Sequence, residues 1–345
     1  MRHLPPVLRA AVLVAGVSAG ALCVTSALAQ ASGSGSVPVF ELDPDWPKIP
    51  AEFRAPFVSG ILLDSEDNAW LITRRHRSEP DGDKIDGPAV MIFDPEGNYI
   101  RGWGGPGEGY EWPESEHNAY IDHNGFFWIS GDACRDRTPG EPDDDQILKF
   151  TQAGEFVMQV GRSNAGTGDS DTLNYKRPPN VQVNPLTNEL FVADGYGNHR
   201  IVVLDAETGA FKRMWGAFGN PPSFTGEEEC FPGEAESFAG VGAMNFSIPH
   251  VLLLSDDGLL YVADRNNRRI QIFTPDGAFV RQVVRYDAPF ARNLAFSRDP
   301  EQTYLYTGYG DGIAMFERKS MTFIGMVEIH GVETGPGHQI NMDSH

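Results

Sequence analysis

The sequence has little cysteine and a shortage of positive charge. Only three of its 345 residues are cysteine, and none of these stands in the C-x-x-C spacing of zinc fingers and thiol redox sites. Acidic residues outnumber basic residues by 48 to 27, which gives a formal net charge of −21. A chain this acidic is not expected to bind nucleic acid or an anionic membrane by general electrostatic attraction. Long stretches with apolar residues at helical spacing are also missing, which argues against a helical fold.

The one run of small and apolar residues at the N-terminus has the form of a secretory signal. Arg2 and Arg9 precede or flank the run at 10–24, and an A-x-A cleavage pattern follows at 27–29. The run is too short and too rich in alanine for a membrane span. We expect residues 1–29 to be removed and the mature chain to be secreted or periplasmic, without a membrane anchor.

Two cysteines remain after the signal, Cys134 and Cys230. An oxidising compartment allows them to form one disulfide. Their wide separation in the sequence neither requires nor excludes the bond, so the sequence leaves their pairing open.

The body of the sequence contains an internal repeat. FVADGYGNHRIVV at 191–203 and YVADRNNRRIQIF at 261–273 share a strand that ends in Val-Ala-Asp, a polar turn with Asn and Arg, and a second strand. Repeats of roughly 40–50 residues with several strands each are typical of a β-propeller. A β-sandwich with coincidental similarity is the alternative, and the matched polar turns argue against it.

Five such units and the start of a sixth can be followed along the chain. Their turns contain Asp-Pro-Glu-Gly, Pro-Asp-Gly or Asp-Asp-Gly, in which glycine supplies the positive φ of a tight hairpin. We predict an all-β, six-bladed propeller over 57–345 with an incomplete last blade. Residues 30–56 are expected to help close the ring, with Pro38 to Leu42 as an outer strand. A five-bladed ring with a tail is the alternative.

Three histidines occupy the same place in alternate units. His117, His250 and His338 each stand just before the first strand of the second, fourth and sixth unit. Equivalent positions of alternate blades converge near the axis, and three imidazoles that leave one position open are typical of a catalytic zinc site. The other histidines considered do not fall at this register and are interpreted as solvated or structural: His76, His123, His199 and His330.

A tyrosine and an arginine are placed where the mouth of a propeller is expected. Tyr196 follows the second strand of the third unit, and Arg75 ends the second strand of the first. The fourth unit has Asn266 at the position assigned to Tyr196, so the repeat does not require the tyrosine. A packed turn aromatic and a basic surface loop, which includes Arg74, are the alternatives.

These motifs resemble the peptidylamidoglycolate lyases, which complete the C-terminal amidation of peptides. The likeness is densest at 192–202 and 249–271, and the repeat itself is shared with the wider NHL propeller superfamily. The resemblance implies lyase cleavage of a peptidyl or small α-hydroxyglycine to an amide and glyoxylate by a zinc-dependent enzyme. It assigns the role of zinc ligands to His117, His250 and His338. The catalytic tyrosine would be Tyr196, and the active-site arginine would be Arg75. We expect the protein to be a monomer.

The sequence also departs from this family. Gly197 stands where the animal enzymes have a disulfide cysteine. Gln339 replaces an aspartate that helps to bind structural calcium in the family, so the sequence leaves open whether this chain binds a calcium ion. Two other functions remain as alternatives. One is a non-catalytic secreted NHL propeller that binds a protein or glycan, and the other is a metal-dependent lactonase-like hydrolase, whose sites favour carboxylate and amide ligands. A ureidoglycolate-like compound is an alternative substrate for the lyase.

Overall fold

The computed structural model describes residues 37–74, 81–135, 142–223, 230, 244–285, 291–309, 312–330 and 340–343. The chain divides into two compact units, Met1–Ala31 and Ser32–His345. The first unit and the signal predicted at 1–29 lie outside the described residues, and all the described strands belong to the second unit. Within the described ranges, no helix is long and apolar enough to cross a membrane.

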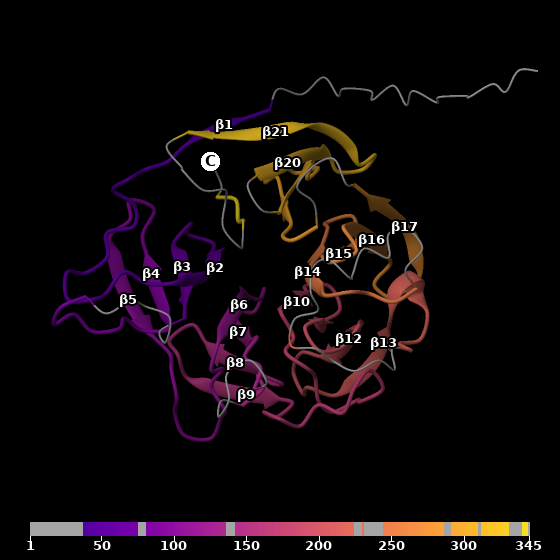
Figure 1. Ribbon diagram of the computed structural model, residues 1–345, viewed down its shortest axis with the longest axis horizontal. Coiled ribbons are helices and arrows are strands. Elements are labelled where there is room, and N and C mark those ends of the chain that lie inside the picture. Colours follow the sequence, from indigo (N-terminus) through magenta and orange to yellow (C-terminus); the bar gives the residue numbers. More distant parts are fainter. Residues whose placement is uncertain are drawn as a thin grey trace, which may run out of the picture. The chain divides into compact units, whose positions relative to one another are not determined.

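The second unit contains five antiparallel sheets, each built from consecutive strands. Figure 1 shows these sheets following one another round a common centre, toward which β2, β6, β10 and β14 lie. The first sheet consists of β2 (Val58–Leu63), β3 (Ala69–Thr73), β4 (Val90–Phe93) and β5 (Tyr99–Trp103). The second consists of β6 (Glu116–Ile121), β7 (Phe126–Gly131), β8 (Ile147–Thr151) and β9 (Phe156–Val160). The third consists of β10 (Asn180–Asn184), β11 (Glu189–Asp194), β12 (Arg200–Asp205) and β13 (Phe211–Trp215).

The last two sheets follow the same order. The fourth consists of β14 (Pro249–Leu254), β15 (Leu260–Asp264), β16 (Arg269–Phe273) and β17 (Phe279–Val284), and the fifth of β18 (Ala295–Phe296), β19 (Tyr304–Tyr309), β20 (Gly312–Glu317) and β21 (Thr322–His330). A short turn of 3-10 helix, η2 (Ala217–Gly219), lies between β13 and β14. The predicted all-β propeller is therefore confirmed, with five sheets among the described residues.

A sixth sheet does not appear in the described part of the chain. Strand β1 (Val39–Glu41), within the outer strand predicted near the N-terminus, pairs in parallel with β21 and extends the fifth sheet (Figure 1). The described C-terminal residues 340–343 form no strand. They contact both neighbouring sheets, because Asn341 Nδ2 donates to the Ile61 carbonyl at 3.5 Å and Arg298 Nε donates to the Met342 carbonyl at 2.8 Å.

In two pairs of neighbouring sheets, a tryptophan of one sheet packs against a hairpin glycine of the next. Trp215 ends the third sheet and lies against Gly277, which turns the last hairpin of the fourth sheet with φ +93°. A Cβ at Gly277 would lie 2.8 Å from the indole ring. Trp103 and Gly154 repeat this arrangement between the first and second sheets, where the corresponding distance is 2.9 Å. Glycine at these turns therefore serves both the backbone conformation and the packing between sheets.

We expect Gly277→Ala to destabilise the fold more than Gly258→Ala. Gly258 also has a positive φ, +80°, but a Cβ there would have open space around it. Both changes place alanine in the left-handed region, at about 1–2 kcal/mol. Only Gly277→Ala also overpacks an indole ring, which adds about 1–3 kcal/mol. Urea unfolding of both variants measures the difference, and equal losses would contradict the proposed packing role.

Candidate functional site

The two described histidines of the predicted site lie at β-bulges. In β6 the pairing with β7 shifts register between Glu116 and Asn118, which leaves His117 as the extra residue. In β14 the pairing with β15 shifts in the same way between Pro249 and Val251, which leaves His250. A bulge re-aims the side chain of its extra residue. Both imidazoles are fully buried.

Backbone carbonyls fix the orientation of both rings. His117 Nδ1 lies 2.8 Å from the Pro179 carbonyl oxygen, and His250 Nδ1 lies 2.5 Å from the carbonyl oxygen of Arg292. A carbonyl only accepts a hydrogen bond, so each Nδ1 carries the hydrogen and each neutral ring presents its lone pair at Nε2. The ring centroids are 5.1 Å apart.

The hydroxyl of Tyr196 lies between the two rings. It is 3.1 Å from His117 Nε2 and 3.0 Å from His250 Nε2. A phenol has one hydrogen to donate, whereas both Nε2 atoms present lone pairs. Two imidazole lone pairs and one phenol oxygen are thus directed at a common region in the interior of the propeller.

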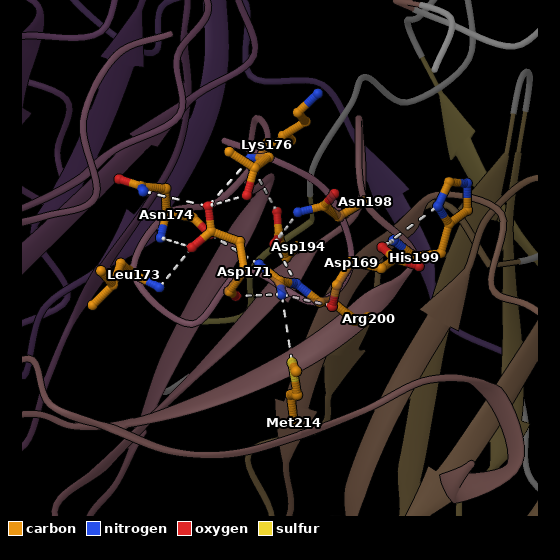
Figure 2. A network of polar contacts seen from close by, with 11 residues as sticks. Asp169, Asp171, Leu173, Asn174, Lys176, Asp194, Asn198, His199, Arg200 and Met214 are labelled. Atoms are coloured by element: carbon orange, nitrogen blue, oxygen red, sulfur yellow. Dashed lines mark hydrogen bonds and ion pairs between the residues drawn. The ribbon is translucent and has the colours of Figure 1, made fainter. Parts of the chain in front are cut away.

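A buried ion pair shapes the turn that carries Tyr196. Asp194 ends β11 and accepts hydrogen bonds from the Lys176 amide, from Asn198 Nδ2 and from Arg200 Nε, the last at 2.8 Å (Figure 2). The remaining donors of Arg200 reach carbonyls of the 169–174 loop, so the guanidinium ties that loop to the turn. Asp194 and Arg200 are both fully buried.

The fourth sheet has the same buried ion pair at its turn. Asp264 accepts a hydrogen bond from Arg269 Nε at 2.6 Å and another from Asn267 Nδ2 at 2.8 Å. These are the Val-Ala-Asp, Asn and Arg positions of the repeat identified in the sequence. The repeat motif is therefore structural, and the residues inside its turn are free to differ between sheets.

Backbone hydrogen bonds define equivalent residues in four sheets. The amides of Arg74, Asp132, Tyr196 and Arg265 each donate to a carbonyl of the segment that enters the same sheet, over 2.9, 2.9, 3.4 and 3.0 Å. We call these four residues the axial ring. The turn of the third sheet has one residue more between its Asp and Arg than that of the fourth, so Arg265, and not Asn266, is the counterpart of Tyr196. The assignment of Asn266 from the sequence was wrong because an alignment without a gap misses this extra residue.

Members of the axial ring contact one another. Arg265 Nη1 lies 3.4 Å from the Tyr196 hydroxyl. Arg74 donates to the carboxylate of Asp132 at 2.8 Å and to the Glu116 carbonyl at 2.8 Å, and both partners of this ion pair are buried. The axial ring therefore places two arginines and one carboxylate near a phenol, and Arg292 adds a third positive charge close by.

Burial dominates the electrostatics of the site. It holds the pKa of His117 well below the ordinary value of 6.5, and the positive charge of Arg74 acts in the same direction. Burial raises the pKa of Tyr196 to about 12, against the opposing effect of the nearby Arg265. Without a bound cation, His117 is neutral and Tyr196 is protonated at neutral pH.

The structure thus brings together His117, His250 and Tyr196. His338 and Arg75 lie outside the described residues, so their predicted roles stay predictions. Among the residues that the structure describes, no group of three or more His, Cys, Asp or Glu side chains is arranged to hold a metal ion. Sequence reasoning missed Arg265 and considered Arg74 only in the alternative of a basic surface loop. The signal that could have found them is their shared place directly after the second strand of a sheet.

Two further features adjoin the site. The structure pairs Cys134 with Cys230, whose Cα atoms are 5.8 Å apart, and so answers the question that the sequence left open. A cavity of about 510 Å³ runs along the inner strands beyond the histidines. Its walls include the side-chain amides of Asn118, Asn180 and Gln182.

We expect Asp194→Asn to destabilise the protein by about 3–5 kcal/mol, because it leaves the buried Arg200 guanidinium without its charged partner. The control is Asp86→Asn, which removes a surface ion pair with Arg54. That change should cost only about 0–1 kcal/mol. Urea unfolding gives both values. Similar small losses for the two variants would show that the buried pair does not support the Tyr196 turn.

Comparison with known proteins agrees with this architecture. An NHL repeat matches residues 246–273. Peptidyl-glycine alpha-amidating monooxygenase B of Xenopus laevis is 29% identical over 262 residues, which cover 70% of this chain but 26% of the frog protein. A probable peptidyl-alpha-hydroxyglycine alpha-amidating lyase of Caenorhabditis elegans is 28% identical over 161 residues, or 46% of this chain and 36% of the relative.

Other similar proteins carry different names. NHL repeat-containing protein 3 of Mus musculus is 27% identical over 245 residues, which cover 69% of this chain and 58% of the mouse protein. Among solved structures, a nidogen/laminin complex matches with a TM-score of 0.51 and 13% identity over 83% of this chain and 85% of that chain, a likeness of fold alone. The chain is thus a β-propeller that matches an NHL repeat over residues 246–273 and is similar in sequence to a probable peptidyl-alpha-hydroxyglycine alpha-amidating lyase.

Proposed function

We propose that this protein is a zinc-dependent lyase that cleaves an α-hydroxyglycine-type carbinolamide to an amide and glyoxylate. The observation that carries the proposal is the convergence of two imidazole Nε2 atoms on one phenol oxygen, at 3.1 and 3.0 Å. Similarity to a probable amidating lyase supports the reaction class.

The residues fit a zinc ion by their chemistry. His117 and His250 each have Nδ1 held by a backbone carbonyl, the arrangement that orients metal-binding histidines. Both rings direct Nε2 lone pairs at one region, and the low pKa of His117 keeps its ligand atom unprotonated. These two histidines would hold the ion, and we propose His338 as the third ligand.

A bound zinc ion would supply Lewis acidity, which lowers the pKa of hydroxyl groups near it. The phenol of Tyr196 needs such an effect, because burial raises its pKa to about 12 even against the opposing charge of Arg265. Arg265, at 3.4 Å from the hydroxyl, favours the phenolate by charge. Tyr196 is then suited to act as the general base.

The reaction that these residues would perform is an elimination. The phenolate of Tyr196 takes the proton of the substrate hydroxyl, and the electron pair left on that oxygen forms the carbonyl of glyoxylate. The bond between carbon and nitrogen breaks, and the amide nitrogen keeps the pair and gains the proton that Tyr196 took, which restores the phenolate. Arg265 and Arg74 provide positive charge for a substrate carboxylate, for which a guanidinium fork is suited. We propose the same role for Arg75.

The setting of the enzyme is also a proposal. We propose that residues 1–29 direct export to a secreted or periplasmic location and that the mature protein acts as a monomer. The substrate is a small or peptidyl α-hydroxyglycine.

We expect Tyr196→Phe to slow glyoxylate release by about 10²–10⁴-fold, the usual contribution of a general base. Zinc content should be unchanged, since both carbonyl-held histidines remain. Steady-state release of glyoxylate from an α-hydroxyglycine and metal analysis of the same sample measure the two effects. Unchanged turnover would exclude Tyr196 as the base.

We expect His250→Gln to lower zinc retention by at least about tenfold after dialysis, because the substitution removes one imidazole ligand. His123→Gln is the matched control, since His123 is exposed and lies on a turn away from the bulges. Inductively coupled plasma mass spectrometry of the purified proteins gives the metal content. Equal zinc in both variants would rule out His250 as a ligand.

A second candidate function is favoured by the likeness to NHL repeat-containing protein 3. In that case the chain is a non-catalytic propeller that binds a protein or glycan. Such a binder has no need of an axial metal, so purified wild-type protein without zinc and without glyoxylate release would support it over the lyase.

A further inference from the structure

Arg177 links the disulfide to the turn that carries Tyr196. Its Nη2 donates to the Tyr196 carbonyl at 3.0 Å, and its Nη1 donates to the Cys230 carbonyl at 3.3 Å. Its own carbonyl accepts the Tyr196 amide at 3.4 Å. The residue is 4% exposed, and its bond to the Tyr196 carbonyl is buried, whereas its bond to the Cys230 carbonyl is partly buried. Tyr196 is thus held at both its amide and its carbonyl by one residue.

The repeat itself does not require an arginine here. Ile248 is the counterpart of Arg177 in the fourth sheet. Both residues have a positive φ, +52° and +58°, and both accept the amide of the axial-ring residue of their sheet. The backbone therefore makes the same turn with an aliphatic side chain. The guanidinium of Arg177 adds a connection that the fourth sheet lacks.

The absence of a side chain at Gly197 leaves room for the Arg177 guanidinium. A Cβ on Gly197 would lie 2.7 Å from Arg177 Nη2 and 2.7 Å from the Cβ of Lys176. The amide of Gly197 also donates to the Lys176 carbonyl at 3.1 Å. Glycine is needed at this position because of the close approach of Arg177.

The disulfide anchors the other end of this connection. Cys134 follows β7 of the second sheet and is 6% exposed, and its bond to Cys230 spans 96 residues of the sequence. The cross-link therefore holds the Cys230 carbonyl in place against the framework of the second sheet.

We propose that Arg177 and the Cys134–Cys230 disulfide form a clamp that positions the Tyr196 backbone, with Arg177 as a positioning residue. The phenol must lie within hydrogen-bond distance of two imidazoles at once, so small movements of its turn matter. The structural part of the proposal stands on the contacts above. The expected effect on catalysis rests on the proposed lyase function.

Hydrogen–deuterium exchange tests the clamp directly. We expect the amides of Tyr196 and Gly197 to exchange about tenfold faster in Arg177→Gln and in the double variant Cys134→Ala/Cys230→Ala than in the wild type. The amides of Arg265 and Asn266, which donate to Ile248 and Ser247 in the fourth sheet, should be unchanged and serve as the internal control.

Two further variants keep the test decisive. Gly197→Ala displaces the guanidinium while Arg177, Tyr196 and both cysteines remain, so it should reproduce the faster exchange even if the cysteine variant folds poorly. Arg101→Gln is the matched control, because Arg101 also donates to a backbone carbonyl, that of Gln152, at an exposed site. Exchange at Tyr196 and Gly197 that stays at the Arg101→Gln level in all clamp variants would overturn the proposal.

Kinetic measurements test the effect of the clamp on catalysis separately from the lyase activity itself. We expect Arg177→Gln to lower kcat for glyoxylate release about tenfold with little change in KM, because the base and not the substrate-binding charge is displaced. A change in KM alone would contradict a positioning role. If the wild type releases no glyoxylate, the lyase proposal fails, and the exchange experiment still decides whether the clamp exists.

Discussion

A backbone hydrogen bond that recurs in four sheets is the constraint on which the site depends. In each sheet the chain leaves the second strand and donates one amide to the segment that enters the same sheet. The bond fixes the backbone of one residue per sheet at the same place in the fold, directly after the second strand. The fold thereby offers four equivalent places, and the sequence fills them with Arg74, Asp132, Tyr196 and Arg265.

The chemistry of the site arises from a balance between burial and fixed charge. Burial keeps His117 neutral and keeps Tyr196 a phenol. Arg265 opposes the second effect, and Asp132 pairs with Arg74 and so limits the positive charge. The zinc ion proposed above would lower the cost of forming the phenolate, because a cation stabilises the negative charge of the oxygen.

The repeat motif explains why the third and fourth sheets can carry different functional residues. The buried pairs Asp194–Arg200 and Asp264–Arg269 build the turn in both sheets. The residues between them are then available for function, which gives a phenol in one turn and a guanidinium in the next. The clamp around Arg177 is an addition that the fourth turn does not have, consistent with a greater need for precision at Tyr196.

The sequence by itself determined the all-β propeller, because strand and turn chemistry repeat locally and each hairpin is decided by near neighbours. It also singled out His117 and His250, since their register follows from the repeat, and Tyr196, which was picked out by its place just after a strand and not by the repeat. Only the tertiary structure decided that Arg74 and Arg265 enter the site, that Arg265 is the true counterpart of Tyr196, and that Cys134 pairs with Cys230. These facts depend on contacts between sheets and on a one-residue difference in turn length, and local patterns carry no information about distances across the ring.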